Sequence, residues 1–317
     1  MNQAVTTTEY LPIYLESLRL NDILEFDLYI KSNIEYILFR SSRLPFTFKT
    51  RTTLLENNIN RLYISIDDRK HYQKHIESNI SQIIENDSID QTTKAGIVYE
   101  CAKHLIQDVL NNPTMGENIK RSQAFVESTV TYLINGKNTF HNLLKVMSYD
   151  YYIYTHSVNV CTFSLALAKY IGIKNARELN LIGTGALLHD VGKTSVPDKI
   201  LNKRGPLNEE EMNIIRKHPQ WGADILGSTA IIMIDSNHPV LQHHERIDGS
   251  GYPNGSLNND IHLYSRIVMI ADVFDAMTTR RVYKSAKDTF WALKEMYKYK
   301  ETFDKKLLEH FTKLMGP

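Results

Sequence analysis

The stretch Leu187-Leu188-His189-Asp190-Val191-Gly192-Lys193 joins an apolar run to an adjacent histidine and aspartate, and then to a glycine and a lysine. Burying an imidazole and a carboxylate at the end of an apolar segment is costly unless something neutralises them. A divalent cation would do so, because histidine and carboxylate side chains are common ligands of transition metals. A hydrogen-bonded pair or a solvated turn is the ordinary alternative, since a dipeptide is weak evidence by itself.

Further histidine and aspartate residues follow at positions that could complete such a metal site. Seven of the twelve histidines lie between His156 and His262. Helical bundles build dinuclear metal sites from side chains on facing helices, and a carboxylate can bridge two ions through its two oxygen atoms. We therefore predict a dinuclear site with Asp190 as the bridge and the following ligands: His156, His189, Asp190, His218, His243, His244 and Asp272.

Each of these residues also has an ordinary structural explanation. A hydrogen-bonded position in the core would explain His156, and a helix end whose carbonyls it contacts would explain His218. A solvated helix end would explain His243-His244, and a local pair with Arg266 would explain Asp272. Each explanation is reasonable alone, but their joint occurrence in this order favours a common site.

The bulk properties are typical of a folded protein. The chain has 317 residues, enough for two domains of about 150 residues each. Apolar residues make up 42% and charged residues 23%. A net charge of +1 indicates neither a nucleic acid polymer nor a membrane surface as a partner. Two cysteines, no signal-peptide layout and no sufficiently apolar long segment predict a cytoplasmic protein.

Three regions with different sequence patterns follow one another. Residues 1–85 contain aromatic and β-branched runs and predict a small α+β domain for sensing, docking or dimer formation. Residues 86–149 predict a helical connector that could pair with a second copy of the chain. Residues 150–317 are predicted to be nearly all helical. The fold class is therefore mainly α, with a C-terminal all-helical bundle, a helical connector and a small N-terminal α+β domain.

Periodicity predicts individual elements within these regions. Strand-like segments cover about residues 23–30, 36–40, 46–48 and 61–66. Helices are predicted at about residues 68–85, 91–110, 118–134, 151–171, 176–189, 208–217, 221–227, 239–245, 264–278, 289–299 and 305–314. No glycine-rich phosphate loop of the Walker or Rossmann type occurs in the sequence.

Five short motifs occur in order in the C-terminal half of the chain. They are Tyr152-x-x-x-His156-Ser157-x-Asn159-Val160, His189-Asp190-x-Gly192-Lys193, His218-Pro219-x-x-Gly222, His243-His244-Glu245 with the tight loop Gly249-Ser250-Gly251-Tyr252-Pro253, and Ala271-Asp272-x-x-Asp275-Ala276. In this combination, residues from about 150 to the C-terminus resemble an HD-GYP domain, a branch of the HD phosphohydrolase superfamily. The N-terminal region also resembles, more weakly, the small domain that precedes some HD-GYP modules.

The resemblance implies a metal-dependent phosphodiesterase that hydrolyses cyclic di-GMP to pGpG, with GMP as a further product, through a hydroxide that bridges two metal ions. It implies an HD-type helical bundle, iron as the usual metal and manganese as another, bound by the seven ligands named above. Implied phosphate contacts are Lys193, Arg281 and Lys284, and the implied residue near the leaving group is Tyr252. The implied catalytic residues are Lys193, Asp190 and Tyr252.

Two positions depart from the family pattern. Some members carry a glutamate four residues before the first histidine, as a ligand of a third metal, and this chain has Tyr152 there. A tyrosine does not replace a carboxylate well, so we expect a dinuclear site, and cleavage beyond pGpG loses support. The family's Arg-Pro-Tyr is Arg281-Val282-Tyr283 in this chain, which keeps the charge and changes the stiffness of the loop.

The resemblance also bears on partners and leaves two other functions open. Cyclic di-GMP is the implied small-molecule partner, GGDEF-domain proteins are candidate partners of the Gly-Tyr-Pro loop, and a homodimer is a candidate assembly. The first alternative is an HD phosphohydrolase of another nucleotide, which a panel of substrates would identify. The second is a catalytically weak cyclic di-GMP receptor or scaffold, which would bind the nucleotide without releasing product.

Overall fold

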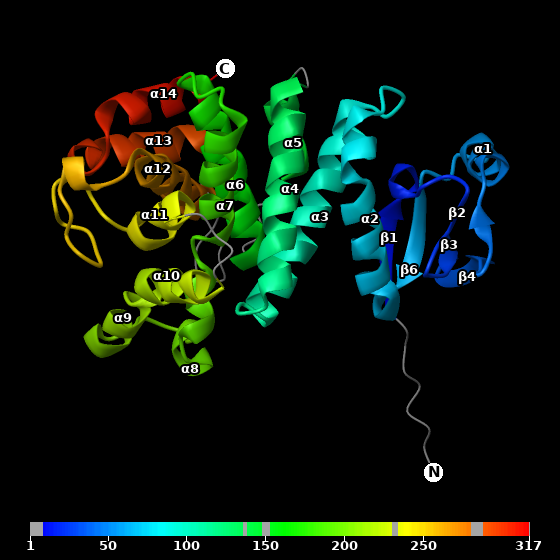
Figure 1. Cartoon of the computed structure of the whole chain (residues 1–317), viewed down its shortest axis with the longest axis horizontal. Coiled ribbons are helices and arrows are strands. Elements are labelled where there is room, and N and C mark those ends of the chain that lie inside the picture. Colours follow the sequence, from blue (N-terminus) through cyan, green and yellow to red (C-terminus); the bar gives the residue numbers. More distant parts are fainter. Residues whose placement is uncertain (1–8, 136–137, 148–152, 230–233, 280–287, 317) are drawn as a thin grey trace, which may run out of the picture. The chain divides into compact units, whose positions relative to one another are not determined.

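The structure, a computed structural model, describes residues 9–135, 138–147, 153–229, 234–279 and 288–316. The chain divides into two compact units, Met1–Cys101 and Ala102–Pro317 (Figure 1). The boundary between them falls within the predicted connector, residues 86–149. The division into three functional regions remains a prediction.

The first unit is built on a four-stranded antiparallel sheet in the order β1-β6-β3-β4. Its strands are β1 (Tyr10–Tyr14), β6 (Arg61–Ser65), β3 (Leu28–Ser32) and β4 (Glu35–Arg40). Side chains alternate between the two faces of a strand. Ile13 and Leu62 lie opposite each other and are buried. Each of the four strands also carries a tyrosine, and the rings of these tyrosines form a chain of contacts: Tyr29, Tyr10, Tyr36 and Tyr63.

The strand predicted over residues 23–30 is instead two strands separated by an irregular segment. The short strand β2 (Asp22–Ile23) pairs with β5 (Pro45–Phe46), and β3 begins only at Leu28. Leu24 and Phe26 between them are buried, so their alternation marks core side chains rather than a continuous strand. The other three predicted strand segments overlap β4, β5 and β6.

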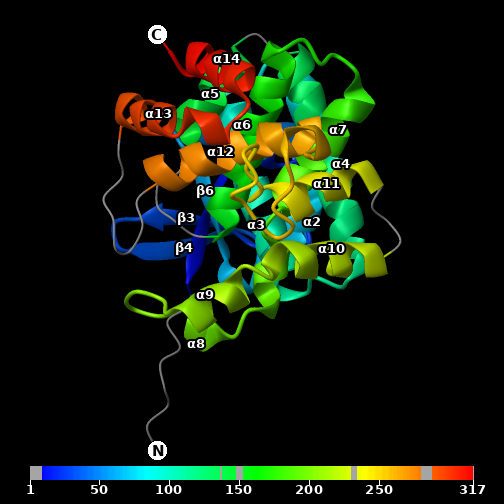
Figure 2. The same ribbon diagram turned by 90° about the vertical axis from the view of Figure 1, so that its left-hand side faces the viewer.

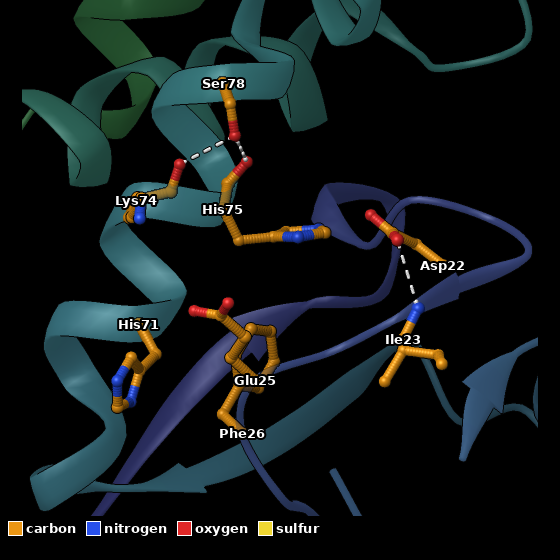
Figure 3. A pocket seen from close by; sticks show the side chains of 8 residues that line it. All are labelled: Asp22, Ile23, Glu25, Phe26, His71, Lys74, His75 and Ser78. Carbon is orange, nitrogen blue, oxygen red and sulfur yellow. Dashed lines mark hydrogen bonds between the residues drawn. The ribbon is translucent and has the colours of Figure 1, made fainter. Parts of the chain in front are cut away.

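Two α-helices lie wholly within the first unit, α1 (Phe48–Glu56) and α2 (Arg69–Glu85). The buried positions of α2 include Ile76, Ile80 and Ile83, at the spacing of one helix face. Figure 3 shows the imidazole of His75 reaching from α2 toward Asp22 of β2, beside a hollow of about 200 Å³. The Nε2 atom of His75 accepts a hydrogen bond from the backbone N–H of Arg19 at 3.1 Å.

The second unit is helical, and helix α3 (Gln91–Asn111) runs across the boundary into it. The remaining helices are α4 (Gly116–Asn135), α5 (Thr139–Val146), α6 (Ile153–Tyr170), α7 (Ala176–Leu188), the 3₁₀ helix η3 (Val191–Ser195), α8 (Asp198–Leu201), α9 (Glu209–Ile215), α10 (His218–Ser228), α11 (Ile234–Gln242), α12 (Leu263–Thr278), α13 (Thr289–Lys298) and α14 (Lys305–Met315).

The predicted helices all overlap helices of the structure, and the differences have physical reasons. Helix α10 begins at His218, earlier than the predicted residue 221, because Pro219 fits the first turn, where its missing N–H has no helical partner. The short helices α5 and α8 were not predicted. They are too short to show a clear hydrophobic period.

Helix α6 forms the centre of the second unit and packs against α7, α12 and α14. Every residue from Thr155 to Ala168 is buried, as expected for a helix surrounded by other helices. The rings of Phe163, Phe274 and Phe311 lie within 5.0–6.1 Å of one another and join α6, α12 and α14. Figure 2 shows α14, α13 and α12 following one another from the top of the view downward.

Membrane-spanning segments are not part of this fold as far as it is described. None of the helices in residues 9–135, 138–147, 153–229, 234–279 and 288–316 is both long and apolar enough to cross a bilayer.

Candidate metal centre

Five segments of the second unit bring the seven predicted ligand residues together. His156 lies on α6, His189 and Asp190 follow α7, His218 begins α10, His243 and His244 follow α11, and Asp272 lies on α12. Their ligand atoms form two groups, each within 4.8 Å. We call them the His156 group (His156, His189 and Asp272) and the His218 group (Asp190, His218, His243 and His244).

The Nδ1 atoms of three imidazoles each contact a backbone carbonyl three or four residues earlier. His189 contacts Ala186 at 2.7 Å, His218 contacts Ile215 at 2.8 Å, and His243 contacts Pro239 at 2.9 Å. A carbonyl oxygen only accepts hydrogen bonds, so the proton of each neutral ring must lie on Nδ1. Each Nε2 atom therefore carries a lone pair, as metal-ligating histidines require.

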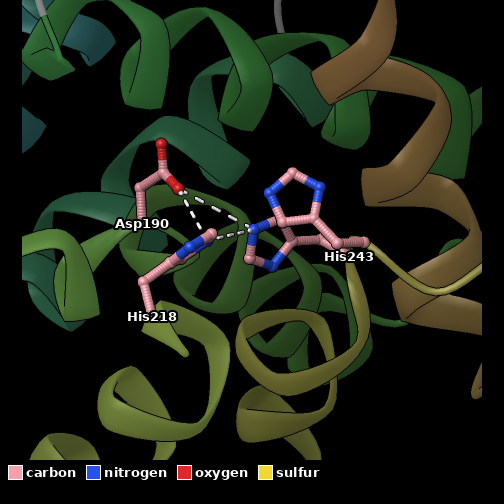
Figure 4. A group of neighbouring side chains, drawn as sticks. Asp190, His218 and His243 are labelled. Carbon is pink, nitrogen blue, oxygen red and sulfur yellow. Dashed lines mark hydrogen bonds and ion pairs between the residues drawn. The ribbon is translucent and has the colours of Figure 1, made fainter. Parts of the chain in front are cut away.

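Asp190 stands between the two groups, and its two carboxylate oxygens face different partners. Oδ1 lies 3.4 Å from Nε2 of His218 and 3.7 Å from Nε2 of His243 (Figure 4). Oδ2 lies 3.7 Å from Nε2 of His156 and 3.4 Å from Nε2 of His189. This division between the oxygens is the geometry expected of a bridging carboxylate.

His156 is oriented by a carboxylate rather than by a carbonyl. Its Nδ1 atom lies 2.7 Å from Oδ2 of Asp275, and the side-chain amide of Asn159 donates to Oδ1 of the same carboxylate at 2.8 Å. Asp275 is fully buried. Asn159 and Asp275 appeared in the sequence motifs but were not predicted as site residues, because only the fold brings two positions 116 residues apart into contact.

The donor set fits divalent cations. The Nε2 atoms of His218 and His243 lie 3.2 Å apart, and with both protons on Nδ1 these are two lone pairs facing each other. Nε2 of His189 and Oδ1 of Asp190 are buried without a hydrogen bond among the described residues. Buried polar atoms of this kind require a partner, and one cation in each of the two groups would satisfy them.

The surroundings shift the imidazole pKa values in opposite directions. Burial lowers the pKa of His218 to about 3 and also lowers the pKa values of His243 and His244. Burial alone would lower the pKa of His156 too, but the carboxylates of Asp272 and Asp275 outweigh it and hold that pKa well above 6.5.

Both carboxylates of the centre remain ionised. Burial alone would raise the pKa of Asp190, but the charge of Lys193 and the neighbouring imidazoles hold it well below its usual range. Burial opposes ionisation at Asp272 as well, where His156 and His244 lower the pKa. The Nζ atom of Lys193 pairs with Oδ2 of Asp190 at 2.6 Å, with 17% of the lysine side chain exposed.

A close backbone approach holds Asp190 next to His218. A side-chain carbon at Gly192 would overlap the backbone carbonyl of His218 and the backbone nitrogen of Gly222. Only glycine allows η3 and α10 to pack this closely. Gly192 of the His189-Asp190 motif and Gly222 of the His218-Pro219 motif therefore belong to the same packing contact.

Glu245 organises the loop that follows the paired histidines. It is fully buried, and its carboxylate accepts hydrogen bonds from the backbone N–H groups of Asn254 at 2.8 Å and Ser256 at 2.9 Å. At Gly251 a side-chain carbon would overlap the backbone of Glu245 and Arg246. The sequence predicted the loop but not the role of Glu245.

The loop places Tyr252 against the His218 group. Its ring stacks on that of His244, with the centroids 4.7 Å apart and an interplanar angle of 25°. Burial raises the pKa of Tyr252 above its ordinary value of 10, so the phenol keeps its proton at neutral pH. This position beside the centre agrees with a role near the substrate.

The predicted phosphate contacts are placed only in part. Lys193 lies at the centre, whereas Arg281 and Lys284, like Tyr152, lie outside the described residues. Two cations that the sequence reasoning missed lie nearby. The Arg216 guanidinium is 5.9 Å from the ring of Tyr252, and the half-buried Arg246 donates to the backbone carbonyl of Glu245.

Two alternatives considered for these residues are not what the structure shows. Arg266 pairs with Asp304 at 2.9 Å, so it is not the partner of Asp272. His243 is fully buried and not solvated. His218 does contact a carbonyl, as expected near a helix end, but with Nδ1 only, which leaves Nε2 facing the centre.

Comparisons with known proteins identify relatives of this region. The family model of the HD domain matches residues 151–307. A cyclic di-GMP phosphodiesterase of Pseudomonas aeruginosa is 34% identical over 234 residues, 72% of this chain and 55% of that protein. A 3'3'-cGAMP-specific phosphodiesterase of Vibrio cholerae is 41% identical over 130 residues, 41% of this chain and 25% of that protein. The chain spans about half or less of these relatives.

A solved structure shares the fold. An HDG"Y"P protein from Bdellovibrio bacteriovorus has a TM-score of 0.67 at 23% sequence identity, covering 97% of this chain and 99% of that one. The predicted fold class, mainly α with an HD-type bundle and a small N-terminal α+β domain, is confirmed. Residues 151–307 therefore form a domain of the HD family, as the resemblance to HD-GYP proteins indicated.

Proposed function

We propose that this chain is a metal-dependent phosphodiesterase that hydrolyses cyclic di-GMP to pGpG. The observation that carries the proposal is the convergence of unprotonated imidazole nitrogens and two ionised carboxylates in one buried centre. The name of the Pseudomonas aeruginosa relative supports the choice of substrate. The Vibrio cholerae relative makes 3'3'-cGAMP the second candidate.

The His156 group and the His218 group would each hold one divalent cation, with Asp190 between them. Such ions would polarise a phosphoryl oxygen and lower the pKa of the water that attacks phosphorus. Imidazole and carboxylate donors suit iron and manganese, and we propose iron, with manganese as the alternative. The carbonyl partners of His189, His218 and His243 would keep each imidazole in the ligating tautomer.

Side chains around the centre would bind the substrate. Lys193 would share its charge between Asp190 and a phosphate oxygen, since part of its side chain is exposed. Arg216 lies beside the ring of Tyr252 and would contact the second phosphate, together with Arg281 and Lys284. Tyr252 would orient the leaving 3′ oxygen or donate a proton to it, because its phenol stays protonated.

For the organisation of the whole chain we keep the sequence prediction as a proposal. We propose residues 1–85 as a sensory or docking domain, 86–149 as a connector and 150–317 as the catalytic domain. GGDEF-domain partners of the loop, a homodimer and a cytoplasmic location stay predictions. The expectation that the site holds two metal ions and no third also stays a prediction. It rests on Tyr152, which lies outside the described residues.

Purification without oxygen, a count of iron and manganese, and chromatography of cyclic di-GMP reactions test the proposal. We expect about two metal ions per chain and the formation of pGpG. Parallel reactions with 3'3'-cGAMP and linear nucleotides decide between phosphodiesterase substrates. Metal-loaded protein that binds cyclic di-GMP and releases no product over hours would overturn the proposal in favour of a receptor.

A further inference from the structure

A groove of about 290 Å³ lies in the first unit, whereas the metal ligands all belong to the second. Its walls are the segment of residues 16–20, Arg51 of α1 and the C-terminal half of α2. Leu18, Ile83 and Ile89 give it an apolar floor, and all three are buried. Most of its other lining side chains are polar or charged, and concave sites with converging polar groups are where small molecules bind.

Two arginines in this groove lack a carboxylate partner. Elsewhere in the chain, Arg121 and Arg266 pair with aspartates at 3.0 and 2.9 Å. Arg19 and Arg51 make no such ion pair among the described residues, although Glu16 lies in the same wall. The Nε atom of Arg51 is buried and has no acceptor within that part of the chain. A buried N–H without an acceptor is costly.

A buried acceptor without a donor accompanies them. Asn79 is only 4% exposed, and its Nδ2 atom donates to the backbone carbonyl of His75 at 2.7 Å. That contact fixes the amide orientation, because a carbonyl cannot donate. Oδ1 of Asn79 is therefore the free atom, and it is buried without a donor among the described residues. The groove thus combines an unmet donor with an unmet acceptor.

We propose that this groove binds a small organic anion, a carboxylate or phosphate ester, that also carries hydroxyl or N–H groups. The guanidinium groups of Arg19 and Arg51 would hold the oxyanion, for which a planar fork of donors is well suited. A hydroxyl or N–H group of the ligand would donate to Oδ1 of Asn79, and Glu16 offers a second acceptor. A neutral ligand would leave both arginines without a counter-charge.

Heat-flow titration of the full chain with matched probes tests the ligand chemistry. Malate differs from succinate by one hydroxyl, and ribose 5-phosphate differs from ribose by the phosphate. We expect malate or ribose 5-phosphate to bind, and the one that binds identifies carboxylate or phosphate as the oxyanion. Removing the hydroxyl or the phosphate should weaken binding about tenfold or more. Absence of binding by every probe at millimolar concentration would overturn the proposal.

Variants locate the binding site. Arg19→Ala and Arg51→Met should each weaken binding about tenfold or more. The control is Lys74→Ala, a cationic position of α2 that lines the neighbouring hollow of Figure 3 instead of the groove, and it should leave binding unchanged. Binding that survives in Arg51→Met would mean that the probe occupies another site, such as the metal centre, and would overturn the proposal.

A second measurement separates ligand binding from a structural role of Arg51. Without ligand, Arg51→Met removes a buried donor that has no acceptor, so the melting temperature should stay the same or rise. A stabilised variant that no longer binds the probe is the expected signature of a binding residue. A clear fall in the melting temperature would show that Arg51 is needed for folding, contrary to the proposal.

Discussion

The His156 group and the His218 group present the same imidazole nitrogen in opposite electrostatic surroundings. The ring of His156 lies between two carboxylates, 3.1 Å from Asp272 and 2.7 Å from Asp275. In the His218 group, His218 and His243 share the carboxylate of Asp190, at 3.4 and 3.7 Å, and His244 lies 3.9 Å from the carboxylate of Asp272. Burial therefore lowers the pKa values of His218, His243 and His244, whereas the carboxylates of Asp272 and Asp275 raise the pKa of His156.

The difference also concerns what holds each ring in place. His218 and His243 are oriented by backbone carbonyls, which no side-chain substitution removes. His156 depends on the carboxylate of Asp275, which Asn159 holds in turn. A carboxylate partner makes a ligating imidazole more basic than a carbonyl does. The His156 group should therefore bind a cation more strongly and be more sensitive to mutation.

Asp190→Ala should disrupt metal binding by both groups, because Asp190 contacts both. We expect loss of both metal ions and a fall in turnover of roughly 10³-fold or more. Metal counting and chromatography of the reaction measure the two effects. Asp198→Ala, on the exposed surface of α8, serves as the control. An active, metal-loaded Asp190→Ala variant would contradict the site assignment.

Asp275→Asn should affect one group only. The variant keeps the shape of the side chain but removes the charge beside Nδ1 of His156, so metal affinity of the His156 group should fall about 10- to 100-fold. Titration with a competing chelator should show one weakened site and one unchanged site. Asn159→Ala should act in the same direction and less strongly. Equal weakening of both sites would remove the contrast between the groups.

Acid should destabilise the metal-free protein through the His218 group. Burial lowers the pKa of His218 to about 3 in the folded state from about 6.5 when exposed. Between these values the unfolded state binds the proton and the folded state does not. Stability is thus complete above about pH 6.5 and falls as the pH decreases, by up to about 1.4 kcal/mol per pH unit for this residue.

The opposite shift of His156 gives this experiment its control. Its folded pKa is raised, so its contribution is present below about pH 6.5 and is lost as the pH rises through the folded value. In chelator-treated protein, His218→Asn should flatten the fall of the melting temperature between pH 7 and about pH 5. His156→Asn should leave this fall nearly unchanged and should instead remove a loss of stability as the pH rises above about 6.5. The same pH response from both variants would contradict the conclusion that His218 is neutral and His156 is protonated in the folded state.

Tyr252→Phe should give the smallest effect. The variant keeps the ring that stacks on His244 and removes only the hydroxyl group. Because burial raises the pKa of Tyr252, the phenol is a weak acid, and we expect turnover to fall only about tenfold. Steady-state rates with cyclic di-GMP measure it. An unchanged turnover would remove Tyr252 from the chemistry and leave it as a packing partner of the His218 group.

Local patterns were sufficient for the helices and for the choice of candidate ligands. The hydrophobic period located α2, α3 and α7 to within two residues of their ends. It failed over residues 23–30, where buried Leu24 and Phe26 alternate outside a strand. Alternation records which side chains are buried, and an irregular segment can bury alternate residues as a strand does.

The sequence by itself determined the residue types of the centre, their order along the chain and the helices that carry them. Only the tertiary structure decided that Asp190 faces both groups, that carbonyls place the proton on Nδ1, and that Asp275 and Glu245 act as supporting residues. The physical reason is distance along the chain. Helix periodicity fixes neighbours three or four residues apart, whereas contacts such as His156 with Asp275, separated by 119 residues, arise from packing of the whole unit.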